Sequence, residues 1–211
     1  MRFGGHETFA IREGWLHKGL KALVERPEWF LDDDLADWLG VGRNMAKSIR
    51  YWLLAAGLAE ITSGRQRDRK LQLAPSLFGR ILWRHDPYFT EPGAWWALHT
   101  NLIHTPDHAA AWTWFFNSFH LDRFDRAVCL ENLYRHLQMS KQRLPNRRTL
   151  ERDVACLLAT YARPIPAGHD DPEEGGDCPF RELGLLSYFK TSGYYQLHQH
   201  TKPIPAELLA A

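Results

Sequence analysis

The chain has 211 residues, of which 45% are hydrophobic, so it can bury a core without disulfides or structural metals. Its formal net charge of +1 excludes a protein that coats nucleic acid through overall basicity. The three cysteines lack a CxxC spacing, and no stretch reaches the roughly 18 apolar residues that a membrane span needs. We therefore expect a cytoplasmic globular protein with no membrane association.

The first third of the chain has the pattern of three helices followed by a hairpin and a further helix. Apolar residues recur at helical spacing in three segments, 11–24, 32–39 and 43–56. Short strands are expected at 59–63 and 70–75, on either side of a basic turn. This order is typical of a winged helix-turn-helix, so we assign residues 1–84 to a DNA-binding domain of that type.

Aromatic residues dominate the next segment, where 91–105 and 108–119 are expected to be buried helices of a connector spanning 85–121. The helix expected at 147–162 repeats the apolar spacing of the third helix 105 residues later, and a second hairpin follows around Thr-Ser-Gly. We expect residues 122–211 to form a second winged-helix-like domain, truncated at its C-terminus. The fold class is mainly α with small β-hairpins.

Positive charge is concentrated in residues 40–84, which hold nine Lys or Arg against two acids. On the third helix, Arg43, Lys47 and Arg50 fall on one stripe opposite the apolar face, with Asn44 and Ser48 beside it. Arg can pair with guanine, Asn with adenine, and Lys neutralises phosphate. The stripe predicts a helix that enters the major groove, and an ordinary solvated helix face is the alternative.

Two further groups of cations are candidate DNA contacts. The tip of the first hairpin could reach backbone phosphates or a minor groove, although a solubilising turn is an equal alternative. The helix at 147–162 has a weaker stripe, because Ala155 stands at the position equivalent to Arg50, so it is expected to serve mainly as a scaffold or partner surface. The candidates are Arg65, Arg67, Arg69 and Lys70 in the tip, and Arg147, Arg148 and Arg152 in the helix.

The segment Gly-Gly-His-Glu-Thr-Phe near the start of the chain combines flexible backbone with a base and a carboxylate. His6 and Glu7 could move a proton or bind a metal, and they are the candidate catalytic residues. The structural alternative is that Glu7 or Thr8 caps the first helix. No acidic stretch has the spacing of a known metal loop, so the residues of a metal site remain open.

Four stretches carry a family resemblance, namely FGGHETFAIREGWLHKGL, LGVGRNMAKSIRYWLLAAGL, RTLERDVACLLATY and DCPFRELGLL. Over nearly its whole length the chain resembles a bacterial family of formerly unknown function, which includes the DNA-nicking component of the single-strand DNA phosphorothioation (Ssp-type) phage-defence system. The resemblance implies binding of double-stranded DNA and nicking of one strand with Mg or Mn. It also implies a cysteine desulfurase, an ATPase and a reductase-like enzyme as partners.

The sequence indicates a DNA nickase only through this resemblance, and two non-enzymatic functions stay open. A non-catalytic winged-helix adaptor or transcription regulator would read base edges through Arg43, Asn44 and Lys47. A protein-interaction module would use the aromatic middle segment, for example as a homodimer interface. No tightly bound cofactor is expected in any of these cases.

Overall fold

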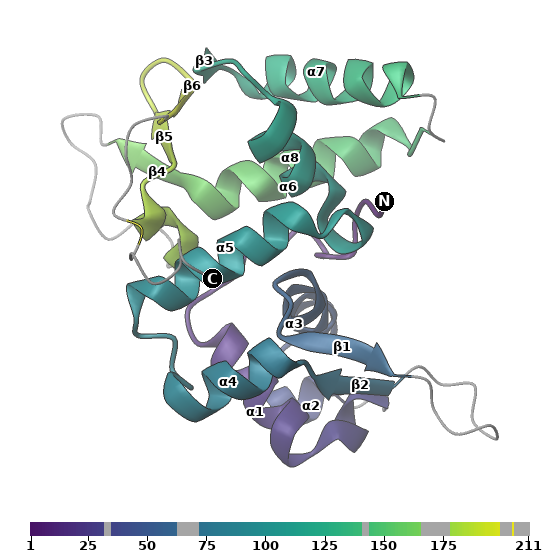
Figure 1. Cartoon of the computed structure of the whole chain (residues 1–211). Helices are drawn as coiled ribbons and strands as arrows, with labels where there is room; N and C mark the ends of the chain where they lie inside the picture. The colour runs from purple at the N-terminus through teal and green to yellow at the C-terminus, as the bar shows by residue number, and fades with distance from the viewer. Residues whose placement is uncertain (32–34, 63–71, 141–143, 166–177, 199–203, 205–211) are drawn as a thin grey trace.

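The structure is a computed structural model. It describes residues 1–31, 35–62, 72–140, 144–165, 178–198 and 204. These residues are mainly helical, with eight α-helices and two small sheets, which confirms a mainly α fold (Figure 1). No helix within these ranges is both long and apolar enough to cross a membrane.

Three helices in the first third pack against one another. They are α1 (Trp15–Glu25), α2 (Leu35–Leu39) and α3 (Arg43–Ala55), with the short 3-10 helix η1 (Pro27–Leu31) between the first two. Gly19 lets α1 approach α3 closely, because a Cβ there would lie 2.6 Å from the Ile49 side chain. Most of the apolar stripe of each helix is buried as predicted, but Trp38 of α2 and Val24 of α1 are exposed.

A hairpin and a fourth helix follow. Strands β1 (Ala59–Thr62) and β2 (Gln72–Pro75) pair antiparallel, and α4 (Leu77–His85) begins directly after them. The Ser76 hydroxyl oxygen accepts the Gly79 N–H at 2.9 Å, which is a helix N-cap. The order of three helices, hairpin and helix is therefore the predicted one, although its assignment to the winged-helix class remains a prediction.

The middle of the chain forms a helical hairpin, α5 (Pro92–His104) and α6 (Pro106–Ser118), and both expected helices are present. Thr105 separates them, and Pro106 begins α6, where a proline at the first position of a helix costs no internal hydrogen bond. Trp112 and Phe115 of α6 are completely or almost completely buried. The aromatic load of this segment is thus largely core, as its composition predicted.

The last third combines two helices with a four-stranded sheet. The helices are α7 (Arg126–Met139) and α8 (Arg147–Tyr161), and a 3-10 helix, η3 (Pro179–Leu183), precedes the final hairpin. The strands are β3 (Arg123–Phe124), β4 (Ala162–Ile165), β5 (Leu186–Phe189) and β6 (Tyr194–Leu197), in the order β3-β6-β5-β4. The predicted hairpin is β5–β6, but the prediction missed β3 and β4, and β4 pairs parallel to β5.

The first residues of the chain lie against the helices of the last two thirds. The Arg2 N–H donates to the Pro106 carbonyl at 2.9 Å, and the Arg2 carbonyl accepts the Ala110 N–H at 3.2 Å. Figure 1 shows the N-terminus beside α6, above α3. The buried hydrophobic residues of the described chain form one continuous cluster, and the proposed domain boundaries remain predictions.

Candidate nucleic-acid interface

The outer face of α3 presents three of the predicted DNA contacts to solvent. Arg43, Asn44 and Lys47 are exposed, whereas Ile49 and Trp52 on the opposite face have no exposed surface. Arg43 and Lys47 are one helical turn apart, so their side chains lie on the same face. The buried face fixes the rotation of the helix about its axis, and the cations therefore have a defined direction.

Ser48 is a correction to the predicted stripe. Its side chain is completely buried, and its hydroxyl has no hydrogen-bond partner among the residues that the structure describes. The reason is geometric, because position 48 lies one step of about 100° from Ile49 and falls within the wide buried arc of α3. Ser48 is therefore not available to DNA in this structure.

Arg50 lies at the edge of the stripe and is half-buried. Its guanidinium donates to the Phe30 carbonyl at 3.3 Å, which ties α3 to η1. Burial and then the positive charge of Arg2 lower the pKa of Arg50 from its usual value. Arg50 is thus a restrained cation beside a second arginine, rather than a side chain that extends freely from the helix.

The cations predicted in the tip of the hairpin lie outside the described residues. Arg65, Arg67, Arg69 and Lys70 all fall within 63–71. Their contact with DNA remains a prediction.

The second group of predicted contacts, at the start of α8, divides into two kinds. Arg147 forms ion pairs with Glu131 and with Glu151, and the hydrogen bond with Glu131 is the main reason that its pKa is raised. Its charge is therefore compensated within the protein. Arg148 and Arg152 are exposed and form no ion pair with another described residue.

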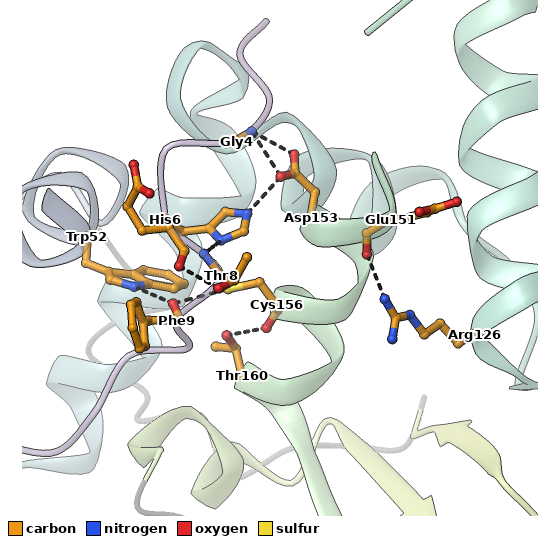
Figure 2. A network of polar contacts seen from close by, with 11 residues as sticks. Gly4, His6, Thr8, Phe9, Trp52, Arg126, Glu151, Asp153, Cys156 and Thr160 are labelled. Carbon is orange, nitrogen blue, oxygen red and sulfur yellow. Dashed lines mark hydrogen bonds and ion pairs between the residues drawn. The ribbon is translucent and has the colours of Figure 1, made fainter. Parts of the chain in front are cut away.

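His6 is held inside the protein by both of its ring nitrogens (Figure 2). The Thr8 N–H donates to Nδ1 at 3.0 Å, so Nε2 carries the ring proton and donates to the Asp153 carboxylate at 2.7 Å. The Gly4 N–H donates to both oxygens of that carboxylate, at 2.9 and 3.0 Å. With 2% of its surface exposed and both ring nitrogens hydrogen-bonded, His6 lacks the solvent access that its predicted catalytic role requires.

Glu7 and Thr8 are exposed in a tight turn, and both have positive φ angles, 49° and 68°. The helix-capping alternative is wrong, because α1 begins after Gly14 and has no side-chain cap. The turn instead returns the Thr8 N–H to His6. Glu7 remains the solvent-accessible member of the predicted catalytic pair.

Asp153 is the site residue that the sequence analysis missed. It is 1% exposed and lies among the apolar positions of α8, next to the fully buried neighbours Leu150 and Val154. An acid inside the apolar stripe of an amphipathic helix is a signal of a buried polar network, because an unpartnered buried carboxylate is costly. That signal could have identified Asp153, although not its partners.

The described residues offer no obvious magnesium site. They contain no group of three or more His, Cys, Asp or Glu side chains that could hold a metal ion. The buried carboxylates of Asp86 and Asp153 already accept backbone N–H groups. The donor set of the described residues therefore does not fit a bound Mg²⁺.

Residues 3–211 match the family described as "Protein of unknown function (DUF4007)", so the chain belongs to that family. It is also similar to two solved structures, a magnesium ion-bound SspB and SspB, at 34% sequence identity and TM-scores of 0.85 and 0.84. The likeness covers 99% of this chain and 63% of each SspB chain. No curated protein matches. The family and the likeness to an Ssp-type component confirm the coarser part of the resemblance.

Proposed function

We propose that this protein binds duplex DNA as a component of a phosphorothioation-type defence system. The observation that supports this best is the exposure of Arg43, Asn44 and Lys47 on one face of α3, whose other face is anchored in the core. In the proposal α3 is the recognition helix of a winged helix-turn-helix, and β1–β2 is its wing. The likeness to SspB supports the place in an Ssp-type system.

Each exposed side chain of α3 has a distinct role in the proposed complex. Arg43 would bind guanine O6 and N7, and Asn44 would bind adenine N6 and N7, in the major groove. Lys47 would neutralise a backbone phosphate and so fix the register of the helix on the duplex. The basic residues predicted to lie at the hairpin tip would add phosphate contacts beside the groove.

The partners of the system belong to the proposal as well. A cysteine desulfurase, an ATPase and a reductase-like enzyme would act on or beside the DNA that this protein holds. The chain spans 63% of the length of the SspB chains, so an activity of SspB can depend on a part that has no counterpart in the present 211 residues. The DNA-binding role requires only the described α3 face.

Fluorescence anisotropy with a labelled duplex tests this role. We expect Arg43→Gln to weaken binding roughly tenfold, because an arginine on a base edge contributes about 1–3 kcal/mol. Lys47→Gln should reduce the slope of log K against log salt concentration by about one, because one phosphate contact is lost. Lys18→Gln changes an exposed cation of α1 and is the matched control. If both α3 variants bind like the parent and the control, the proposal is wrong.

Nicking of DNA is a second candidate function, favoured by the magnesium ion-bound form of SspB. The assay is relaxation of supercoiled plasmid by the parent and by Glu7→Gln, with Mg²⁺ or Mn²⁺ and with a chelator. Relaxation that needs the metal and is lost in Glu7→Gln supports a nickase in which Glu7 takes part. Plasmid that stays supercoiled under every condition supports the alternative, a non-catalytic adaptor or regulator.

A further inference from the structure

We propose that Arg2 joins the basic face of α3 to the start of α8, so that both helices hold the phosphates of one DNA duplex. This inference rests on the proposed function and extends it from a single helix to a surface shared by the first and last thirds of the chain. The surface consists of Arg43, Lys47 and Arg50 of α3, Arg2, and Arg148 and Arg152 of α8.

The backbone of Arg2 is fixed although its side chain is exposed. Its N–H and carbonyl are both hydrogen-bonded to the start of α6, through the Pro106 carbonyl and the Ala110 N–H. An arginine near a chain end would otherwise lose considerable backbone entropy when it bound a ligand. Because the backbone of Arg2 is already ordered in the folded protein, this loss does not recur on binding, and Arg2 is a preorganised cation.

The guanidinium of Arg2 lies toward α3. A Cβ on Gly5 would lie 3.5 Å from a guanidinium nitrogen of Arg2 and 3.0 Å from the ring of Tyr51, the residue after Arg50. The pKa values of Arg50 on α3 and His108 on α6 are both lowered. Burial is the larger cause in each case, and the positive charge of Arg2 is the second. The acid beside His108, Asp107, pairs with the N-terminal amino group at 3.1 Å.

Arg2 and Arg50 thus carry like charges on neighbouring parts of the surface, since the Arg2 guanidinium lies near Tyr51, the residue after Arg50. Neither forms an ion pair with a carboxylate among the described residues. Holding two cations together costs electrostatic energy, and an anion between them reverses the sign of that interaction. A phosphate diester is the repeating anion of the proposed ligand, and arginine binds its oxygens in bidentate geometry.

The same segment of chain runs along the start of α8. The Gly4 N–H is bonded to Asp153, and a Cβ on Gly4 would lie 3.5 Å from the methyl carbon of Thr149. Thr149 and Asp153 directly follow the exposed Arg148 and Arg152. Figure 1 accordingly shows the N-terminus between α3 and the first turns of α8. Arg147 is left out of the surface, because Glu131 and Glu151 neutralise it.

The test compares the affinity of Arg2→Gln and the parent for duplexes of about 10 and about 30 base pairs over a range of salt. Gln keeps the backbone bonds and removes the charge. We expect the variant to bind the long duplex roughly fivefold more weakly and with a salt slope smaller by about one, and to bind the short duplex nearly as the parent does. The Arg148→Gln, Arg152→Gln double variant should have the same preference. Arg163→Gln on β4, away from the N-terminus in Figure 1, is the control and should bind normally.

The outcomes separate this inference from the proposed function. If Lys47→Gln weakens binding while Arg2→Gln keeps the affinity and salt slope of the parent on both duplexes, the shared surface is wrong and the role of α3 stands. If the parent does not bind duplex DNA, or prefers single strands of equal length, both are overturned. Arg2→Lys guards against a folding defect, because it retains the charge and should restore most of the affinity lost in Arg2→Gln.

Discussion

The carboxylate of Asp153 accepts the single Gly4 N–H, shared between its two oxygens, and the ring N–H of His6 on Oδ1. Burying a carboxylate is unfavourable by several kcal/mol unless hydrogen bonds replace its water. The rings of Tyr51 and Trp112 lie edge-on to the imidazole, with centroids 5.7 and 5.9 Å away, and exclude solvent. The hydrogen bonds of Gly4 and His6 to Asp153 therefore attach the start of the chain to α8.

His6→Ala should lower the free energy of unfolding by about 3 kcal/mol, because it leaves the buried Asp153 carboxylate without one of its donors. Urea unfolding followed by circular dichroism measures this change. Glu7→Ala, at the exposed neighbouring position, is the control and should stay within about 0.5 kcal/mol of the parent. Equal stability of the two variants would contradict a structural role for His6.

Ser48→Ala should raise the free energy of unfolding by about 1 kcal/mol, since it removes a buried hydroxyl without a partner among the described residues and adds helix propensity. Its affinity for duplex DNA should equal that of the parent. Urea unfolding and anisotropy check the two expectations separately. A loss of affinity at unchanged stability would return Ser48 to the DNA interface.

At the scale of elements, α5 and α8 are joined by a buried hydrogen bond between His99 Nδ1 and the Tyr161 hydroxyl, at 2.9 Å. Burial, and then the charge of His104, lower the pKa of His99 to about 4. The unfolded chain therefore takes up a proton near pH 6.5, whereas the folded chain does so only near pH 4. The stability that the folded protein gains from keeping His99 neutral is fully present above about pH 6.5 and is lost as the pH falls toward about 4.

The free energy of unfolding of the parent should consequently fall by about 3 kcal/mol more than that of His99→Gln between neutral pH and about pH 4. Gln cannot titrate, so the comparison isolates the contribution of His99. Urea unfolding at closely spaced pH values gives both curves. Parallel curves would show that His99 is not the residue that couples this packing to pH.

The elements that the sequence predicted well are those with a periodic apolar face. The third helix, expected at 43–56, spans Arg43–Ala55, and the strands of the first hairpin are each within two residues of the expected bounds. β3 was missed because two residues carry little periodic signal, and β4 was missed because it directly continues α8 and contains Pro164. Their partners are also remote, since Ala162 pairs with Leu186 and Arg123 with Gln196.

At the scale of the whole molecule, the candidate site was only partly predictable. Periodicity placed Arg43 and Lys47 on the outer face of α3, because exposure follows from the helix alone. Arg2 could not be found in this way, since its position depends on bonds such as the one between Gly4 and Asp153, 149 residues apart. Long-range contacts of this kind decide which helices share one surface.

Directed cleavage from a single added cysteine tests the central claim that α3 faces DNA. The native thiols should not react with the labelling reagent, because all three are buried and burial raises the pKa of Cys129 and Cys178 to about 12 and also raises that of Cys156. An iron chelate can therefore be attached at Asn44→Cys, or at Ser192→Cys in the exposed β5–β6 turn as a control.

The measured quantity is the total cleavage of an end-labelled duplex at saturating protein. We predict that the chelate at position 44 cuts the duplex and that the chelate at position 192 does not. Absence of cleavage from position 44, or equal cleavage from both positions, would contradict the assignment of α3 as the DNA-binding helix.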